Sequence, residues 1–142
     1  MKKYEVGYTQ GVFDMFHIGH LNLIKNAKEQ CEYLIVGVNS DKLVKQYKSK
    51  TVVVSENERK QIVESIRFVD KCLIVDKLDK IELWKQLKFD AIFIGDDWKG
   101  SKRWIETEQQ LKKVNADVIY LKYTKGVSST ELRTKADDKV DD

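Results

Sequence analysis

Short apolar runs alternate with longer amphipathic segments along most of the chain. The apolar runs predict five strands, at Tyr4–Tyr8, Tyr33–Val38, Lys71–Val75, Asp90–Ile94 and Asp117–Leu121. The amphipathic segments predict helices near His20–Gln30, Asp41–Gln46, Glu56–Phe68, Lys80–Lys88 and Arg103–Val114. This strand–helix repetition predicts an α/β fold, in which one parallel sheet has helices on both faces.

Four polar or glycine-containing motifs directly follow predicted strands. They are Gly11–His20, Asn39–Asp41, Gly95–Trp98 and Gly126–Thr130. In parallel sheets, ligands bind beyond the carboxyl ends of the strands. The four motifs are therefore expected to meet around one ligand site.

The first motif, Gly11-Val12-Phe13-Asp14-Met15-Phe16-His17-Ile18-Gly19-His20, lies between a predicted strand and a predicted helix. A helix N-terminus carries unpaired N–H groups and a partial positive charge, so it favours anions. His17 and His20 are three positions apart and would point to one side of the helix. Gly11 and Gly19 would let the backbone come close to a bulky ligand. Together with the two histidines, this arrangement suits a polyphosphate. The alternatives are a helix cap or surface role, and a zinc pair, for which no further ligand cluster is visible.

This motif resembles the signature of the cytidylyltransferase family, which includes the glycerol-3-phosphate, choline-phosphate and ethanolamine-phosphate enzymes. His-Ile-Gly-His also resembles the class I aminoacyl-tRNA synthetases, but 142 residues leave no room for a tRNA-binding domain. The cytidylyltransferase resemblance implies a Rossmann-like, doubly wound, five-stranded parallel sheet of the HIGH-motif nucleotidylyltransferase type. It also implies catalytic roles for His17 and His20. The nucleotide contacts it implies from this motif are Gly11, Val12, Phe13, Asp14 and Gly19.

A second resemblance to the family runs from Lys48 to Asp70. Lys48 precedes a Thr-Val…Glu-Asn-Glu-Arg stretch, as a similar lysine does in choline-phosphate cytidylyltransferases. This implies that Lys48 contacts phosphates and helps catalysis, with Lys50 as a second candidate on the acceptor side. Arg67 matches an arginine expected to contact the acceptor phosphate or CTP, whereas Arg59 is expected to be structural. By its position alone, Arg67 would be a surface residue near a helix end.

A third motif, Gly95-Asp96-Asp97-Trp98-Lys99-Gly100, follows a buried apolar run. Its carboxylates could hold a ribose hydroxyl, a base amino group or Mg²⁺, or could be turn and cap residues. Glycerol-3-phosphate cytidylyltransferases have a similar Gly-Asp-Asp-Trp-x-Gly motif, which implies that Asp96 lies in the nucleotide pocket.

The last motif runs from Thr124 to Glu131. Within it, Ser128 and Glu131 form a capping box, which predicts a new helix start and a second anion cradle. It resembles the family's Arg-Thr-x-Gly-Ile-Ser-Thr-Thr/Ser. Tyr123 stands where the family has arginine, so Lys122, Lys125 or Arg133 would have to replace that cation. The implied nucleotide contacts are Thr124, Gly126, Val127, Ser128, Ser129 and Thr130.

Length and charge set the remaining expectations. We expect one domain over residues 1–135 and a disordered acidic tail over 136–142. The net charge is only +3, and the lysines are interleaved with acidic residues, which argues against nucleic-acid binding. No apolar run approaches the ~18 residues of a membrane span, and Met1-Lys2-Lys3 is followed by no apolar signal core. A cytoplasmic protein is expected.

The function that the resemblance implies is transfer of CMP from CTP to a small phosphorylated alcohol. Glycerol 3-phosphate is the favoured acceptor, giving CDP-glycerol for teichoic-acid or other surface-polymer synthesis. Mg²⁺ would arrive with CTP, no dedicated protein metal site is expected, and the family usually forms homodimers. The alternatives are phosphocholine, phosphoethanolamine or another polyol phosphate as acceptor, an adenylyltransferase of the same fold, and a nucleotide-binding regulator. The tyrosine at position 123 is the feature that favours the regulator, whereas the intact His17, Gly19, His20 and Lys48 argue against it.

Overall fold

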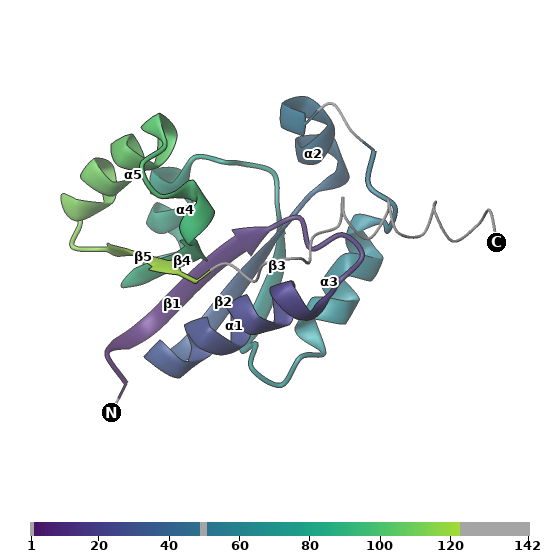
Figure 1. The fold of residues 1–142 in the computed structure, drawn as a ribbon, viewed down its shortest axis with the longest axis horizontal. Coiled ribbons are helices and arrows are strands. Elements are labelled where there is room, and N and C mark those ends of the chain that lie inside the picture. Colours follow the sequence, from purple (N-terminus) through teal and green to yellow (C-terminus); the bar gives the residue numbers. More distant parts are fainter. Residues whose placement is uncertain (1, 49–50, 123–142) are drawn as a thin grey trace.

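A five-stranded parallel sheet forms the centre of the computed structural model, which describes residues 2–48 and 51–122 (Figure 1). The strands are β1 (Tyr4–Gly11), β2 (Cys31–Asn39), β3 (Lys71–Val75), β4 (Ala91–Gly95) and β5 (Asp117–Leu121). They pair in the order β3-β2-β1-β4-β5, and every pairing is parallel. The predicted strands and the parallel sheet are confirmed.

The predicted helices are also confirmed, with changed bounds. They are α1 (Ile18–Gln30), α2 (Asp41–Lys48), α3 (Glu56–Glu64), α4 (Lys80–Leu87) and α5 (Lys102–Lys112), and a 3₁₀ turn spans Asp96–Trp98. The helix predicted to reach Phe68 ends at Glu64. After Glu64 the backbone turns to enter β3, and Asp70 holds this turn against β2. The backbone N–H of Asp70 donates to Leu34 O (3.0 Å), and the Asp70 carboxylate accepts from Leu34 N (2.7 Å).

Each face of the sheet has its own hydrophobic core. Side chains alternate along a strand, so Leu34 and Val36 of β2 face one core while Ile35 faces the other. Helices α1 and α3 cover the first face, and α4 and α5 cover the second (Figure 1). No helix in the described part of the chain is both long and apolar enough to cross a membrane.

A chain of hydrogen bonds joins the carboxyl ends of β1 and β2. The Tyr8 hydroxyl donates to Gln10 Oε1 (2.7 Å), and Gln10 Nε2 donates to Asn39 Oδ1 (2.8 Å). Asn39 Nδ2 then donates to the Tyr47 hydroxyl (2.9 Å). Gly37 makes room for this arrangement, since a Cβ there would lie 2.3 Å from the Tyr8 hydroxyl. The chain holds polar side chains in fixed orientations where ligands are expected.

Candidate active site

A cavity of about 440 Å³ opens beyond the carboxyl ends of β1 and β4. The strand order reverses direction at these two strands, and such a switch point is where α/β sheets bind ligands. Residues from both faces of the sheet line the cavity. The predicted site residues among them are Gly11, Val12, Phe13, Asp14, His17, Gly19, His20 and Lys48.

The turn after β1 is built by left-handed residues and by Gly11. Phe13 has φ 55° and Met15 has φ 50°, which reverses the chain sharply before α1 begins. Phe13 is buried, and a Cβ on Gly11 would lie only 3.2 Å from its ring. The sequence predicted that Gly11 lets the backbone come close to a ligand. Among the described residues, Gly11 makes room for the Phe13 ring, whose centroid lies 5.4 Å from that of the His20 ring.

His17 and His20 form a stacked pair at the start of α1, with ring centroids 3.8 Å apart. His17 is the N-cap residue, and its Nδ1 accepts from Gly19 N–H (3.1 Å). The His17 N–H in turn donates to His20 Nδ1 (3.2 Å). Because each Nδ1 is an acceptor, a neutral imidazole carries its proton on Nε2. The capping role and the site role are therefore compatible: the caps fix both tautomers as Nε2–H donors.

The charge state of His20 follows from its surroundings. Burial, followed by the neighbouring His17, lowers the pKa of His20 to about 3, while Asp14 opposes the shift. His20 is therefore neutral near pH 7. A neutral imidazole can still donate a hydrogen bond to a phosphate oxygen, and it needs no proton transfer to do so.

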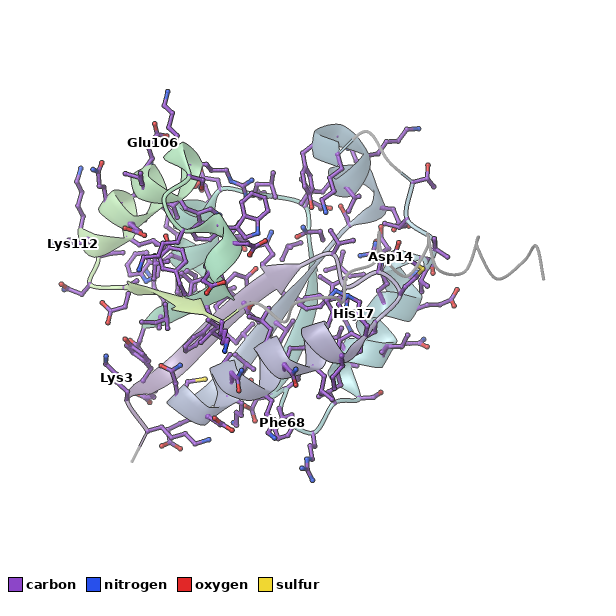
Figure 2. The ribbon with its side chains drawn as sticks, in the orientation of Figure 1. Lys3, Asp14, His17, Phe68, Glu106 and Lys112 are labelled. Carbon is purple, nitrogen blue, oxygen red and sulfur yellow. The ribbon has the colours of Figure 1, made fainter. Side chains whose placement is uncertain are left out.

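Asp14 links the first motif to the segment that precedes α3. Its carboxylate is buried and accepts from Val53 N (2.8 Å) and Val54 N (2.9 Å). Figure 2 shows Asp14 and His17 at the same end of the molecule. Asp14 was predicted as a nucleotide contact; it does line the cavity, and it also holds the segment carrying Thr51 and Val52 against that cavity.

Arg59 is the largest fully buried side chain in the described residues, at 1% exposure. Its Nε donates to Val54 O (2.8 Å), one terminal nitrogen donates to Val12 O (2.7 Å) and Asn39 O (2.8 Å), and the other pairs with Asp41 (2.5 Å). The guanidinium therefore connects the first motif, the end of β2, the start of α2 and the segment before α3. The structural role expected for Arg59 fits this geometry.

Two of the predicted site residues that the structure describes do not line the cavity. Asp97, and not its neighbour Asp96, lines the cavity. The 3₁₀ turn brings the Asp97 carboxylate back over Gly95, so that a Cβ added to Gly95 would lie 2.7 Å from Asp97 Oδ1. Arg67 lies in the turn before β3, at the opposite end of the strands, with its guanidinium 4.9 Å from the Phe68 ring. Figure 2 shows Phe68 well separated from His17 and Asp14. The geometry of this chain therefore gives Arg67 no contact with the cavity.

Several predicted residues lie outside the described part of the chain. They are Lys50, Tyr123, Thr124, Gly126, Val127, Ser128, Ser129 and Thr130. Lys48 ends α2 and lines the cavity, with its ammonium 5.8 Å from the Tyr47 ring.

The cavity has a second wall that the sequence motifs did not indicate. It comes from α2, α4 and α5 and includes Tyr47, Lys80, Arg103 and Trp104. Lys80 is 6% exposed, and its Nζ donates to Leu78 O (2.7 Å) and lies 5.6 Å from the Trp104 ring. The only sequence signal for Lys80 was its position at a helix start after a strand.

No group of three or more His, Cys, Asp or Glu side chains in residues 2–48 and 51–122 could hold a metal ion. Of the acidic residues, Asp14 and Asp97 line the cavity.

Comparison with known families agrees with this fold. The family model described as Cytidylyltransferase-like matches residues 8–135. The chain belongs to this family.

Several curated relatives are similar over most of the chain. Glycerol-3-phosphate cytidylyltransferase of Staphylococcus aureus is 34% identical over 131 residues, which cover 88% of this chain and 89% of that protein. The Bacillus spizizenii protein of the same name is 38% identical over 128 residues, covering 88% and 92%. FAD synthase of Thermococcus sibiricus is 34% identical over 116 residues, covering 81% and 78%.

A solved structure shares the fold. The lipopolysaccharide core biosynthesis protein from Thermoplasma volcanium superimposes with a TM-score of 0.71 at 22% identity, covering 87% of this chain and 99% of that one.

Proposed function

We propose that this protein transfers the cytidylyl group of CTP to glycerol 3-phosphate, giving CDP-glycerol and pyrophosphate. The observation that carries the proposal is the stacked His17–His20 pair, which caps α1 through both Nδ1 atoms and lines the cavity, so that each neutral ring carries an Nε2–H donor. The relatives named glycerol-3-phosphate cytidylyltransferase, at 34% to 38% identity, support the choice of nucleotide and acceptor.

The chemistry is an in-line displacement at phosphorus. A phosphate oxygen of the acceptor attacks the α-phosphorus of CTP, the bond from that phosphorus to the bridging oxygen breaks, and the electron pair leaves with pyrophosphate. No covalent enzyme intermediate is required, because positioning and charge stabilisation supply the catalysis. His17 and His20 donate to the phosphate oxygens as charge develops, and the positive end of α1 and the Lys48 ammonium lie beside the same cavity.

Mg²⁺ enters the proposal with the nucleotide. This ion keeps several waters and binds mainly to substrate phosphates, so it needs no protein cage. When bound, it neutralises part of the triphosphate charge. Asp97 is the candidate protein contact, since it lines the cavity, whereas the Asp14 carboxylate accepts from two backbone N–H groups.

A second candidate is adenylyl transfer to a flavin, because a FAD synthase is also 34% identical to this chain. Thermal-shift titration with CTP and with ATP separates the two. Preferential stabilisation by CTP supports the cytidylyl reaction, and preferential stabilisation by ATP overturns it.

Two finer proposals rest on the family resemblance. The protein acts as a homodimer in the cytoplasm, and its product supplies surface-polymer synthesis of the teichoic-acid type. Analytical ultracentrifugation tests the dimer. A monomeric protein at the concentration used in the activity assay would contradict the homodimer.

The direct test measures pyrophosphate release from Mg-CTP with glycerol 3-phosphate, and with ATP as the nucleotide control. We expect release with CTP and a loss of about 10²-fold in kcat for His17→Ala and for His20→Ala, the usual effect of removing one preorganised donor. Binding of CTP without release for any phosphorylated alcohol would favour the nucleotide-binding regulator. Unchanged turnover in both variants would overturn the proposed site.

A further inference from the structure

The hydrogen-bond chain that starts at Tyr8 runs in one fixed direction from donor to acceptor. Gln10 Nε2 donates to the Lys77 carbonyl (2.9 Å) as well as to Asn39 Oδ1 (2.8 Å). A backbone carbonyl can only accept, so this atom of Gln10 must be the amide nitrogen, and Gln10 Oε1 must face the Tyr8 hydroxyl. Asn39 Oδ1 is then an acceptor, and Asn39 Nδ2 donates to the Tyr47 oxygen (2.9 Å). The Lys77 carbonyl therefore sets the direction of the bonds as far as Tyr47.

Helix α2 is attached at its last turn by this chain. The helix has eight residues, and a helix this short is only marginally stable by itself. Its first turn is held by Ser40 Oγ, which accepts from Leu43 N (3.1 Å), and by the buried Leu43 and Val44. Of its last four residues, Lys45–Lys48, Tyr47 is the one that is not exposed. Figure 1 shows α2 beyond the end of the sheet, apart from the helices that cover its faces. The Tyr47 hydroxyl therefore ties an otherwise exposed turn to the end of β2.

Lys48 is carried by the same turn. It directly follows Tyr47 and lines the cavity, and its ammonium lies 5.8 Å from the centroid of the Tyr47 ring. In the proposed function this ammonium lies beside the phosphates, where charge develops. Misplacing a group at a reacting centre by about 1 Å can cost about 10²-fold in rate. What holds Tyr47 in place therefore bears on how Lys48 acts.

The other end of the chain is anchored in the middle of the sheet. Tyr8 is fully buried and stacks on Phe89, with ring centroids 5.2 Å apart, and Asn39 is 4% exposed. Gln10 belongs to β1, which pairs with β2 on one side and β4 on the other. The same strand leads into the turn that carries the histidine pair. The chain thus places Lys48 relative to the strand that also places the histidines.

We propose that Gln10 and Asn39 are positioning residues, which act through Tyr47 to hold Lys48 at the phosphates of the nucleotide. This inference rests on the proposed function and adds to it two side chains that its chemistry does not yet use. It also gives a role to Asn39, which the sequence placed at the site without one. Gln10 and Asn39 line the cavity themselves, so a direct contact with a ligand is the competing explanation. The two explanations differ in one respect: a positioning effect vanishes when the Lys48 ammonium is removed, whereas a direct contact persists.

The test is a double-mutant cycle between Gln10 and Lys48. Gln10→Met keeps the length of the side chain and removes its donor and acceptor. We expect it to lower kcat for pyrophosphate release about 10-fold, with the KM for glycerol 3-phosphate within about 3-fold of wild type. Lys48→Met should lower kcat about 10²-fold, and adding Gln10→Met to it should lower kcat by less than about 2-fold more. Multiplied losses, about 10³-fold in the double variant, overturn the inference, as does an unchanged kcat in Gln10→Met.

Two further variants separate positioning from folding. Gln46→Met is the matched control, because Gln46 is exposed on α2 and is not among the described residues that line the cavity; its kcat should stay within about 2-fold of wild type. Tyr47→Phe breaks the last bond of the chain from the α2 side and should reproduce both the loss in kcat and its dependence on Lys48. If circular dichroism shows that Gln10→Met does not fold, Tyr47→Phe takes its place in the cycle. An unchanged kcat in Tyr47→Phe overturns the inference, because the ring remains while its attachment is lost.

Failure of the proposed function is distinguished by a binding cycle. If wild type gives no turnover with any nucleotide and acceptor, the same four proteins are titrated calorimetrically with inorganic triphosphate, which carries the charge of the nucleotide without its base. Weaker binding to Gln10→Met, with no further weakening in the Lys48→Met background, supports the positioning role. Equal weakening in both backgrounds, or none in either, overturns it.

Discussion

Replacing Arg59 should be the most destabilising single change among the described polar residues. In Arg59→Met the carbonyls of Val12, Asn39 and Val54 lose their donor, and Asp41 loses its ion-pair partner. Each buried group left without a partner costs about 1–3 kcal/mol, and breaking a buried ion pair costs about 3–5 kcal/mol. These terms are not additive, and the Asp41 side chain is 43% exposed and can be hydrated again. We expect a loss of about 4 kcal/mol in the free energy of unfolding.

The assay is urea unfolding followed by circular dichroism, with thermal unfolding as a second measurement. For a chain of this size the expected loss lowers the Tm by about 15 °C. Arg59→Lys should lose about 2 kcal/mol or more, because one ammonium cannot reach four acceptors in three directions. Lys60→Met is the matched control: Lys60 is on the same helix and pairs with Glu64 at the surface, so its loss should be much smaller than that of Arg59→Met. A loss below about 1 kcal/mol for Arg59→Met would refute the reasoning.

Three further predictions follow from the described geometry. The pKa of His20 is about 3 in the folded protein, against an ordinary value of 6.5, so the unfolded state binds a proton first and the free energy of unfolding falls as pH drops from 6.5 toward 3. In urea titrations at a series of pH values, His20→Gln should make the free energy of unfolding depend less on pH over this range. Gly37→Ala places a Cβ 2.3 Å from the Tyr8 hydroxyl and should lose about 1–3 kcal/mol; Tyr8→Phe in the same chain should recover part of this in a double-mutant cycle, and full additivity would contradict the clash. Removal of Mg²⁺ with EDTA should abolish pyrophosphate release while leaving the Tm of the nucleotide-free protein unchanged, and a lower Tm would indicate a resident metal site instead.

The fold and the histidine pair could be predicted because their signals are local. Apolar runs such as Tyr33–Val38 and the Gly11–His20 motif need no knowledge of distant residues. The sequence also indicated that polar motifs would meet at the carboxyl ends of the strands, and most residues of the Gly11–His20 motif line one cavity together with Asn39 and Asp97.

The second wall of the cavity could not be predicted, because its residues are brought together by contacts between distant parts of the sequence. Lys80 begins a helix as many solvated lysines do, and its burial depends on Trp104, 24 positions later in the chain. Asp96 and Asp97 are equivalent in the motif, and only the 3₁₀ turn decides which carboxylate reaches the cavity. The anchoring of Val53 and Val54 by Asp14 likewise depends on a loop returning from 39 positions away.

The cavity takes one wall from each hydrophobic core, and the sheet lies between the two cores. Side chains that pack beneath α4 and α5 therefore belong to a different core from those that pack beneath α1. Because distant sites without shared partners contribute almost additively, we expect substitutions in the two cores to have nearly additive effects on stability. Proteins with different printed names, a glycerol-3-phosphate cytidylyltransferase and a FAD synthase, are each 34% identical to this chain over most of its length.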